Sequence, residues 1–438
     1  MSADAPSAVP RSAPPHGLRS SAALNDLLLR YFKDAVEAGR RGQPVAWVSQ
    51  GFPVEVLHAM DITPICPIMN GVLRRDTRAL DAAEAAGYAT DICSEIKNQL
   101  GEMLLDDYGF VEIPRPTMVL TSTNYCTAFV KWGQVVEHHF DVPGYCFDLP
   151  APRADHPRAA ARYCREQFEG LQRFLEECVG RRCQTGRLID AFMRSEEANV
   201  TWLRVLGYNR HRPAPLNALD IYPHFLPLLI MRGTQGAVRH YRALEREVRE
   251  RVAEGVATVP GERHRLLWDY LPVYARTRFF TRKFARAQAS FVVAPYFLPS
   301  EPRIPLRHLQ RAVVERLVRY GLTPGLLGWS LRYFARAYLE QNNALPLAAR
   351  VARLTQLVRD YAVDGFVLHN YRTCRRFCAS QYELNKALTA ATGVPGVVFD
   401  ADAFDTRFFS EGQINTRIEA FMETLERQKG VRNYGTAA

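Results

Sequence analysis

Short apolar segments alternate with amphipathic segments in the first third of the chain. The apolar segments are bounded by Gly, Pro and polar residues, which is typical of strands that a sheet buries on both faces. Between them, apolar side chains recur at helical spacing. The expected strands are 44–49, 62–67, 117–122 and 143–150, and the expected helices are 22–38, 53–60, 78–87, 94–109 closed by Gly109, and the segment after Cys126.

The same alternation returns near the end of the chain. The expected strands are 265–270, 290–299, 365–370 and 394–402, and the expected helices are one that ends near Leu357, 378–393 and 414–428. The residues between the two regions show almost no strand pattern, and long amphipathic stretches occupy 163–180 and 238–255. This middle part therefore predicts a helical insert.

Strands that alternate with helices favour a parallel sheet covered by helices on both faces. We therefore expect an α/β fold with two doubly wound parallel-sheet domains, Rossmann- or flavodoxin-like, and a helical insert. The first residues are rich in Ser, Ala and Pro, which is typical of a disordered tail. The expected boundaries are 1–22 for the tail, 23–152 for the first α/β domain, 153–258 for the helical region and 259–438 for the second α/β domain.

Composition favours a soluble globular protein. The chain has 438 residues, of which 47% are hydrophobic, and this is enough for more than one core. No segment approaches the roughly 20 uncharged apolar residues that a membrane span needs, and the first residues lack the apolar region of a secretion signal. We expect a cytoplasmic protein that does not associate with membranes.

The net charge of +10 is almost entirely due to arginine, since six of the 56 basic residues are lysine. A GC-rich genome explains such a bias without any function. Alternatively, arginines line the approach to a phosphorylated ligand or an acidic partner, because guanidinium groups bind phosphate bidentately. Both explanations remain open. No dense basic block is interleaved with aromatic residues, which argues against a nucleic-acid partner.

Three cysteines stand where expected helices begin. Cys126 and Cys374 each follow an expected strand, and Cys93 precedes the helix that starts at residue 94. Open α/β sheets bind ligands at the carboxyl edge of their strands, and a helix N-terminus is expected to lower the pKa of a thiol. The chain has nine cysteines, an odd number, which argues against a disulfide framework.

Two interpretations of these three thiols are open from the residues alone. The chain has no C-x2-C pair, which is the usual sign of a structural zinc site. Three separated thiolates, two from one α/β unit and one from the other, fit an iron–sulfur cluster held in a cleft between the domains. Alternatively, all three are buried and inert.

The other cysteines are expected to have structural roles. Cys66 and Cys146, which lie in apolar strands, are expected in the core. Cys164, Cys178 and Cys183 lie in the helical insert without ligand-like neighbours and are expected to be structural. Cys378 follows Cys374 by one helical turn and shares its face. It is either a packing residue or a second candidate ligand.

Several segments resemble one known family. They are GFPVEVLHAMDITPICP, DICSEIKNQLG, STNYCTAFVKW, DGFVLHNYRTCRRFCASQYELNKAL and VVFDADAFDTRFFSEGQINTRIEAFMETLE, in this order between about Val45 and Leu425. Together they resemble the 2-hydroxyacyl-CoA dehydratase and benzoyl-CoA reductase family. The first segment is most similar to the B subunits of ATP-dependent (class I) benzoyl-CoA reductases, which act in anaerobic aromatic degradation.

The resemblance implies one [4Fe–4S] cluster per chain, bound through Cys93, Cys126 and Cys374, with Cys378 as a possible alternative ligand. It also implies an iron–sulfur subunit that reduces the ring of benzoyl-CoA to a cyclohexadienoyl-CoA. The resemblance is also compatible with two other functions. One is a subunit of a 2-hydroxyacyl-CoA dehydratase, which removes water through a ketyl radical, and the other is a non-catalytic subunit that carries a cluster.

The resemblance further implies partners. The chain has neither a G-x-x-x-x-G-K-[ST] nor a G-x-G-x-x-G motif, so it offers no recognisable phosphate-binding loop. ATP would be used by separate ATPase activator subunits with their own iron–sulfur cluster. Ferredoxin would donate electrons, a homologous second cluster-bearing subunit would complete the enzyme, and an acyl-CoA would be the substrate.

Glu55, in FPVEVLHAM, occupies a recurrent position of that family. It is either a first-turn carboxylate that the helix dipole stabilises, or a catalytic group that hydrogen-bonds to substrate or transfers a proton. His58, one turn further on, is expected to be a packed imidazole.

Overall fold

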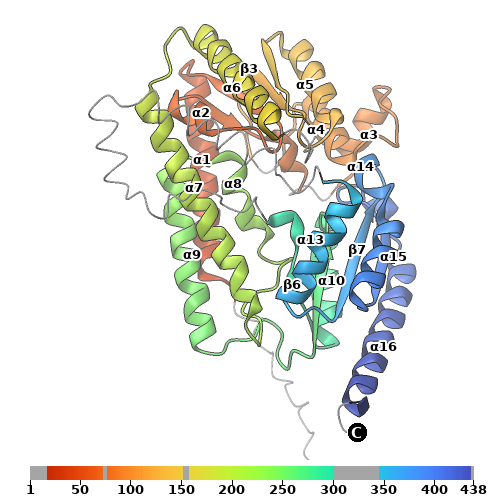
Figure 1. The fold of residues 1–438 in the computed structure, drawn as a ribbon. Coiled ribbons are helices and arrows are strands. Elements are labelled where there is room, and N and C mark those ends of the chain that lie inside the picture. Colours follow the sequence, from red (N-terminus) through yellow and green to blue (C-terminus); the bar gives the residue numbers. More distant parts are fainter. Residues whose placement is uncertain (1–16, 73–75, 110, 151–156, 299–344, 436–438) are drawn as a thin grey trace, which may run out of the picture.

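The protein is described here by a computed structural model that covers residues 17–72, 76–109, 111–150, 157–298 and 345–435. Two α/β domains lie one above the other, and long helices run along one side of both (Figure 1). Residues 1–16 of the expected tail lie outside the described residues. In the remainder of that segment, helix α1 (Arg19–Arg40) already begins at Arg19.

The first sheet has four parallel strands in the order β2-β1-β3-β4. The strands are β1 (Val45–Val48), β2 (Thr63–Ile65), β3 (Met118–Ser122) and β4 (Gly144–Phe147). The helices that connect and cover them are α2 (Glu55–Ala59), the 3-10 helix η1 (Pro67–Val72), α3 (Arg78–Ala85), α4 (Ser94–Leu105) and α5 (Thr127–Phe140).

The second sheet repeats this arrangement, with parallel strands in the order β6-β5-β7-β8. The strands are β5 (His264–Asp269), β6 (Ala289–Val293), β7 (Gly365–Tyr371) and β8 (Gly396–Ala401). The helices are η4 (Tyr274–Arg276), α10 (Thr277–Arg286), η5 (Pro295–Phe297), α13 (Leu347–Asp360), α14 (Arg375–Cys378), α15 (Gln381–Thr392), η8 (Thr406–Phe408) and α16 (Glu411–Gly435).

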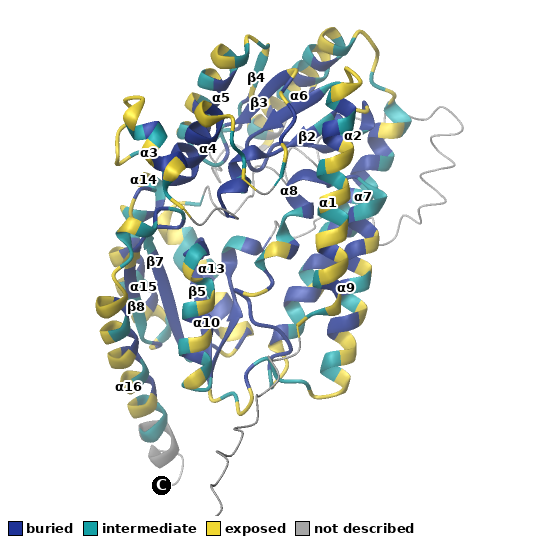
Figure 2. Cartoon of the chain, turned by 180° about the vertical axis from the view of Figure 1, so that it is seen from behind, coloured by how far each residue is buried: buried dark blue, intermediate teal, exposed yellow. Residues whose placement is uncertain are grey.

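Between the two sheets in sequence, the described residues from 157 to 253 form only helices and loops. They are α6 (Pro157–Val179), α7 (Thr185–Gly207), η2 (Tyr208–Arg210), η3 (Tyr222–Phe225), α8 (Pro227–Ile230) and α9 (Gln235–Ala253). Helices α1, α7 and α9 run side by side along the molecule (Figures 1 and 2). The indole of Trp202 on α7 donates to Phe297 O at 2.8 Å, so this helical layer is fixed to the second domain.

Burial on both faces explains why the inner strands have apolar centres. Every residue of β1, β3, β5 and β6 is buried, and Figure 2 shows the inner strands of both sheets in dark blue beneath partly exposed helices. Trp47 on β1 and Trp268 on β5 are fully buried. Their indole N–H groups donate to Pro114 O at 2.9 Å and to Leu271 O at 3.2 Å, so each ring fills the core without an unsatisfied polar atom.

Both sheets reverse their strand order at an equivalent point. The reversal falls between β1 and β3 in the first sheet and between β5 and β7 in the second. Loops at the carboxyl ends of the strands diverge at such a switch point and leave a crevice for a ligand. Cys126 follows β3 and Cys374 follows β7, so each cysteine lies at the switch point of its own sheet.

The predicted α/β architecture with two parallel sheets and a helical insert is confirmed. Some predicted boundaries are wrong. The predicted strand 290–299 ends at Val293 and is followed by the 3-10 helix η5, and α4 ends at Leu105 and not at Gly109. Asp106 adopts a left-handed conformation there (φ 48°) and ends the helix, since Asp tolerates this conformation better than most residues. Within the ranges that the structure describes, no helix combines the length and the apolar character that crossing a membrane requires.

Candidate functional site

Cys93, Cys126 and Cys374 each begin a helix, as predicted. They are the N-cap residues of α4, α5 and α14, respectively, and all three are half-buried. Cys126 and Cys374 have extended backbone conformations, so the chain changes from strand and loop to helix at the thiol itself. The first domain thus contributes two of these cysteines and the second domain contributes one.

A buried hydrogen-bond network joins the Cys93 loop to the second domain. The Ser94 backbone N–H donates to Thr373 Oγ1 at 3.0 Å, and the Ser94 hydroxyl donates to one oxygen of Asp402. The Thr373 hydroxyl donates to the other Asp402 oxygen at 2.7 Å. Because Ser94 and Thr373 are the immediate neighbours of Cys93 and Cys374, the network holds these two cysteines at one domain boundary.

Two arginines of α14 complete the connection between the loops. Arg375 forms an ion pair with Asp91, and Arg376 Nη1 donates to Asn124 O at 3.3 Å. Each of these partners lies two residues before a cysteine of the first domain. The segment that contains Cys374 therefore contacts both of the cysteine loops of the other domain.

Two buried tyrosines approach two of the thiols. The Tyr270 hydroxyl lies 3.4 Å from Cys374 Sγ, and the Tyr371 hydroxyl lies 3.8 Å from Cys93 Sγ. Tyr270 has a φ of 74°, which is strained for a bulky side chain. Its ring stacks on Phe377, with the two centroids 3.6 Å apart. A strained tyrosine that contacts a cysteine at a switch point indicates that the fold positions this hydroxyl for function.

Burial raises the pKa of all three thiols. The pKa of Cys374 rises to about 11, that of Cys126 is also raised, and that of Cys93 lies well above its ordinary value, where the nearby Glu95 carboxyl and the Cys374 thiol add to the effect of burial. The expectation that the helix N-termini lower these pKa values is wrong. Backbone N–H groups at the helix starts, such as that of Phe129 beside Cys126, do favour the thiolate, but desolvation outweighs them. Thiolates at this site therefore need a positively charged partner.

The donor set fits a group that binds each thiolate at a separate positive centre. Within the described parts of the chain, no three His, Cys, Asp or Glu side chains converge closely enough to hold one metal ion. A single ion draws cysteine sulfurs to about 2.3 Å from one point, whereas an iron–sulfur cluster binds each cysteine through a different iron. Three helix-start thiols on three loops that contact one another directly fit the second kind of group.

The loop after β1 closes the site on the side of the first domain. Gln50 Nε2 donates to Glu95 Oε1 at 2.5 Å, and Gln50 Oε1 accepts from the Tyr296 hydroxyl at 2.9 Å. Burial raises the pKa of Glu95 to about 8. Gly51 has a φ of 74°, and a Cβ there would lie 2.2 Å from the ring of Tyr125. Only glycine lets this loop pass beside the residue that precedes Cys126.

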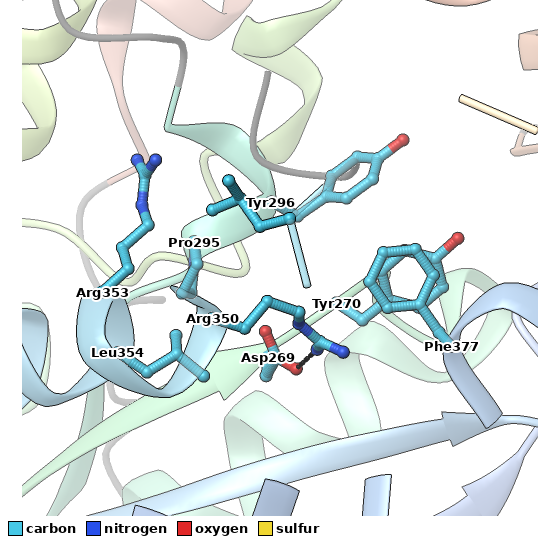
Figure 3. Close-up of a pocket in the computed structure, with 9 residues that line it drawn as sticks. Asp269, Tyr270, Pro295, Tyr296, Arg350, Arg353, Leu354 and Phe377 are labelled. Atoms are coloured by element: carbon cyan, nitrogen blue, oxygen red, sulfur yellow. Dashed lines mark hydrogen bonds and ion pairs between the residues drawn. The ribbon is translucent and has the colours of Figure 1, made fainter. Parts of the chain in front are cut away.

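A small cavity lies on the other side of Tyr270. Figure 3 shows the stacked rings of Tyr270 and Phe377 beside Arg350, which pairs with Asp269 at 2.8 Å. The Arg350 guanidinium also lies 4.9 Å from the centroid of the Phe377 ring, a favourable cation–π geometry. The cavity volume is about 30 Å³, which is room for about one water molecule. These contacts therefore support the stacked rings of Tyr270 and Phe377 next to Cys374. The cavity is too small for an acyl group.

Glu55 is buried at the start of α2 and belongs to a connection between elements. Its Oε1 accepts from the Ser195 hydroxyl at 2.6 Å and lies 3.5 Å from Arg232 Nε. Arg232 in turn donates to Phe52 O at 2.9 Å. His58 is packed as expected, with Nε2 2.7 Å from Ile230 O, and burial lowers its pKa. These contacts fix α2 against the helical region.

The remaining cysteines lie in varied surroundings. Cys66 and Cys164 are buried, as expected, Cys183 is half-buried and Cys178 is exposed. The expectation that Cys146 belongs to the core is wrong, since it is exposed on β4, an edge strand of its sheet. Cys378 ends α14, is half-buried, and donates its backbone N–H to Cys374 O at 3.0 Å. Its role as an alternative ligand stays a prediction.

The residues that support the thiols belong to no recognised sequence motif. They are Tyr270, Tyr371, Gln50 and Arg376. One signal was available for the tyrosines, because each stands at the carboxyl end of a predicted strand, where ligand-binding residues gather. No local pattern shows that either hydroxyl points at a cysteine.

The fold and the site define a class of protein with two parallel-sheet domains and a cysteine-lined site between their switch points. The model of the family described as 2-hydroxyglutaryl-CoA dehydratase, D-component, matches residues 50–425. The chain belongs to this family.

The chain is similar over most of its length to several known subunits. It is 26% identical to the (R)-phenyllactyl-CoA dehydratase alpha subunit of Clostridium sporogenes, over 93% of this chain and 95% of that one. It is 23% identical to the (R)-2-hydroxyglutaryl-CoA dehydratase subunit alpha of Acidaminococcus fermentans, over 92% of this chain and 96% of that one. It is 24% identical to one of the benzoyl-CoA reductase B subunits, that of Thauera aromatica, over 84% and 85%. The family thus includes both dehydratase and reductase subunits.

Proposed function

We propose that this chain is the iron–sulfur subunit of an acyl-CoA enzyme, and that Cys93, Cys126 and Cys374 hold one [4Fe–4S] cluster. The main support is that three helix-start thiols from two domains are connected through direct contacts between their loops. With three protein ligands, such a cluster would keep one iron without a protein ligand. Membership in the family supports the same assignment.

When bound, such a cluster supplies single electrons at low potential. The chain's own residues then have three tasks. The helix-start N–H groups and the thiolates would hold the group, the Tyr270 hydroxyl donates a hydrogen bond to the Cys374 sulfur, and the surrounding aromatic rings exclude water. Exclusion of water strengthens these polar contacts.

We propose that the reaction is the reduction of the aromatic ring of benzoyl-CoA to a cyclohexadienoyl-CoA. Each ring takes up two electrons and two protons, and no group leaves. Similarity to one of the benzoyl-CoA reductase B subunits supports this reaction. The apolar cluster in which Cys374 lies, formed largely by aromatic side chains, supports it too, since such surroundings suit an aryl thioester.

Dehydration of a 2-hydroxyacyl-CoA is the second candidate, because the dehydratase alpha subunits match a larger share of this chain than the reductase subunit does. This reaction is redox-neutral: water leaves, and the electron that enters at the start returns at the end. One priming electron then supports many turnovers.

We also propose that partners deliver the electrons. The homologues are subunits of multi-subunit enzymes, and this sequence has no recognised ATP-binding motif. A second, homologous cluster-bearing subunit, ATPase activator subunits and ferredoxin would complete the system. The purified chain alone should neither bind nor hydrolyse ATP.

The test counts the electrons that the anaerobically reconstituted complex consumes for each molecule of product. With benzoyl-CoA, cyclic dienoyl-CoA should form in proportion to a limiting reductant, with two electrons consumed per product. With phenyllactyl-CoA, the same complex should give little water loss. Catalytic dehydration after a trace of reductant, with benzoyl-CoA unchanged, would contradict the reductase assignment and establish the dehydratase.

Glu55 is proposed as a residue that positions α2 beside the site. Its contacts with Ser195 and Arg232 support this role. Glu55→Gln should lower thermal stability, and Ser195→Ala should do so to a smaller extent. A normal unfolding midpoint, combined with a changed pH profile of turnover, would instead support direct proton transfer by Glu55.

A further inference from the structure

A larger cavity lies next to the cysteine site, on the side of the helical region. Its volume is about 400 Å³, within the size range of pockets that bind small ligands. Helix α1 forms one wall, the β2–η1 segment a second, and η3 and α8 a third. Asn25 and Leu29 of α1 are exposed, and Leu29 is 60% accessible. The cavity thus has an opening to solvent at α1.

The inner end of this cavity reaches the side chains that surround Cys374. Met69, Tyr222 and Tyr296 line the cavity and also pack in the same apolar cluster as Cys374. The Tyr296 ring meets the Tyr270 ring edge-on, with centroids 5.5 Å apart. The Tyr270 hydroxyl is in turn 3.4 Å from Cys374 Sγ. Two side chains in succession, Tyr296 and Tyr270, therefore connect the cavity to this thiol.

The described residues around the cavity offer no charged partner to a ligand. None of the described residues that line it is Lys, Arg, His, Asp or Glu. Among its polar groups, the Asn70 amide already donates to Tyr108 O and Glu102, and the Tyr296 hydroxyl donates to Gln50. A carboxylate inside would lose its hydration without gaining an ion pair, which is strongly unfavourable. An apolar ring or alkyl group would bury its surface favourably.

We propose that this cavity receives the acyl group of the CoA thioester and selects an uncharged aryl or alkyl group against one that bears a second carboxylate. The inference rests on the proposed function and narrows its substrate class. It separates this chain from its 2-hydroxyglutaryl-CoA relative, whose named substrate has a dicarboxylic acyl group. Both candidate reactions remain compatible with it, since benzoyl and phenyllactyl groups have no free carboxylate.

The first experiment compares the binding of two thioesters that differ only in the acyl group. Isothermal titration calorimetry on the anaerobically purified complex gives the Kd of benzoyl-CoA and of glutaryl-CoA. Benzoyl-CoA should bind about 100-fold more tightly or better, because mismatched polar groups in a buried site are strongly rejected. Equal affinities would overturn the proposal.

Two variants test the location. Leu229→Trp fills the cavity from α8 and should weaken benzoyl-CoA binding at least about tenfold. Asn25→Arg places a cation at the exposed mouth, where it is tolerated, and should raise the affinity for glutaryl-CoA relative to benzoyl-CoA. Ala23→Arg adds the same charge to an exposed position of α1 outside the cavity. If Asn25→Arg and Ala23→Arg give the same ratio of affinities, the assignment is refuted.

Iron content measured on the same samples distinguishes a failure of the proposed function from a failure of the cavity assignment. A wild-type complex in which this chain binds no iron refutes the proposed function. A complex with full iron content that binds both thioesters equally, or that is unaffected by Leu229→Trp, refutes the cavity assignment alone.

Discussion

The Tyr270 hydroxyl lies 3.4 Å from Cys374 Sγ, although the two residues are 104 positions apart in the sequence. Tyr270 follows β5 and Cys374 follows β7, and these strands are neighbours at the switch point of the second sheet. The strained backbone of Tyr270 is held by the stacking of its ring on Phe377. The fold thus stabilises an unfavourable backbone conformation of Tyr270 that places its hydroxyl next to the Cys374 thiol.

Tyr270→Phe should lower the reduction potential of the bound cluster without removing it. A hydroxyl that donates to a ligand sulfur stabilises the more negative, reduced form, so its loss makes the cluster harder to reduce. The shift is measured by a redox titration followed by electron paramagnetic resonance. Tyr145→Phe is the control, since that hydroxyl donates to Gln167 O, away from the thiols. An unchanged potential in an iron-replete Tyr270→Phe protein would contradict the prediction.

Cys126→Ala, and likewise Cys93→Ala and Cys374→Ala, should abolish binding of the cluster. The anaerobically prepared wild-type chain should contain about four irons, the content of one [4Fe–4S] cluster. Cys178→Ala is the matched control, because Cys178 is exposed in the helical region, and it should retain all of the iron. Colorimetric iron analysis together with the visible absorption spectrum decides the outcome. Full iron content in Cys126→Ala would exclude this residue as a ligand.

Gly51→Ala should destabilise the protein and disturb the loop that leads to Cys126. The new Cβ would lie 2.2 Å from the Tyr125 ring, in a backbone conformation with φ 74°. We expect a loss of about 1–3 kcal/mol in the free energy of unfolding, together with partial loss of iron. Gly87→Ala is the control, because Gly87 also has a positive φ but has open space around its Cβ position. It should cost about 1–2 kcal/mol, which is the cost of the backbone conformation alone, and leave the iron content unchanged. Equal effects of the two variants would show that the contact with Tyr125 is unimportant.

Glu84→Gln should weaken the contact between the two domains in a pH-dependent way. Glu84 on α3 accepts hydrogen bonds from Arg407 of the second domain and from the buried Lys97, both at 2.6 Å, and these contacts lower its pKa to about 2. A carboxylate whose folded pKa is below its unfolded value stabilises the fold at higher pH and loses this contribution as pH falls from the unfolded pKa toward the folded one.

Glu84→Gln should therefore lower the free energy of unfolding by about 1–3 kcal/mol at pH 7. This loss should stay constant down to about pH 4.5 and should shrink at lower pH. Urea unfolding between pH 7 and 3.5 measures the free energy of unfolding of both proteins. Glu112→Gln removes an ion pair with Arg40 in which both side chains are exposed, and it should cost less than about 1 kcal/mol at every pH. A loss for Glu84→Gln that does not change with pH would contradict this account.

Much of the fold follows from the sequence by local rules. The strand pattern around Val45–Val48 and Gly365–Tyr371, and the helix starts after Cys126 and Cys374, depend on residues that are close together in the chain. Apolar continuity and helical spacing report this local preference directly. For the same reason the boundary near Leu105 was missed, because Asp106 ended the helix where Gly109 was the stronger local signal.

Only the tertiary structure decided which residues meet and how deeply they are buried. The contact of Ser94 with Thr373 spans 279 positions, and no local pattern encodes it. The sequence alone placed the thiols at helix N-termini, where their pKa should fall, but desolvation by distant parts of the chain raises it. Likewise, Cys146 has the apolar neighbours of a core residue but lies on an edge strand. Local periodicity determines secondary structure, whereas burial, charge balance and side-chain contacts depend on segments that only folding brings together.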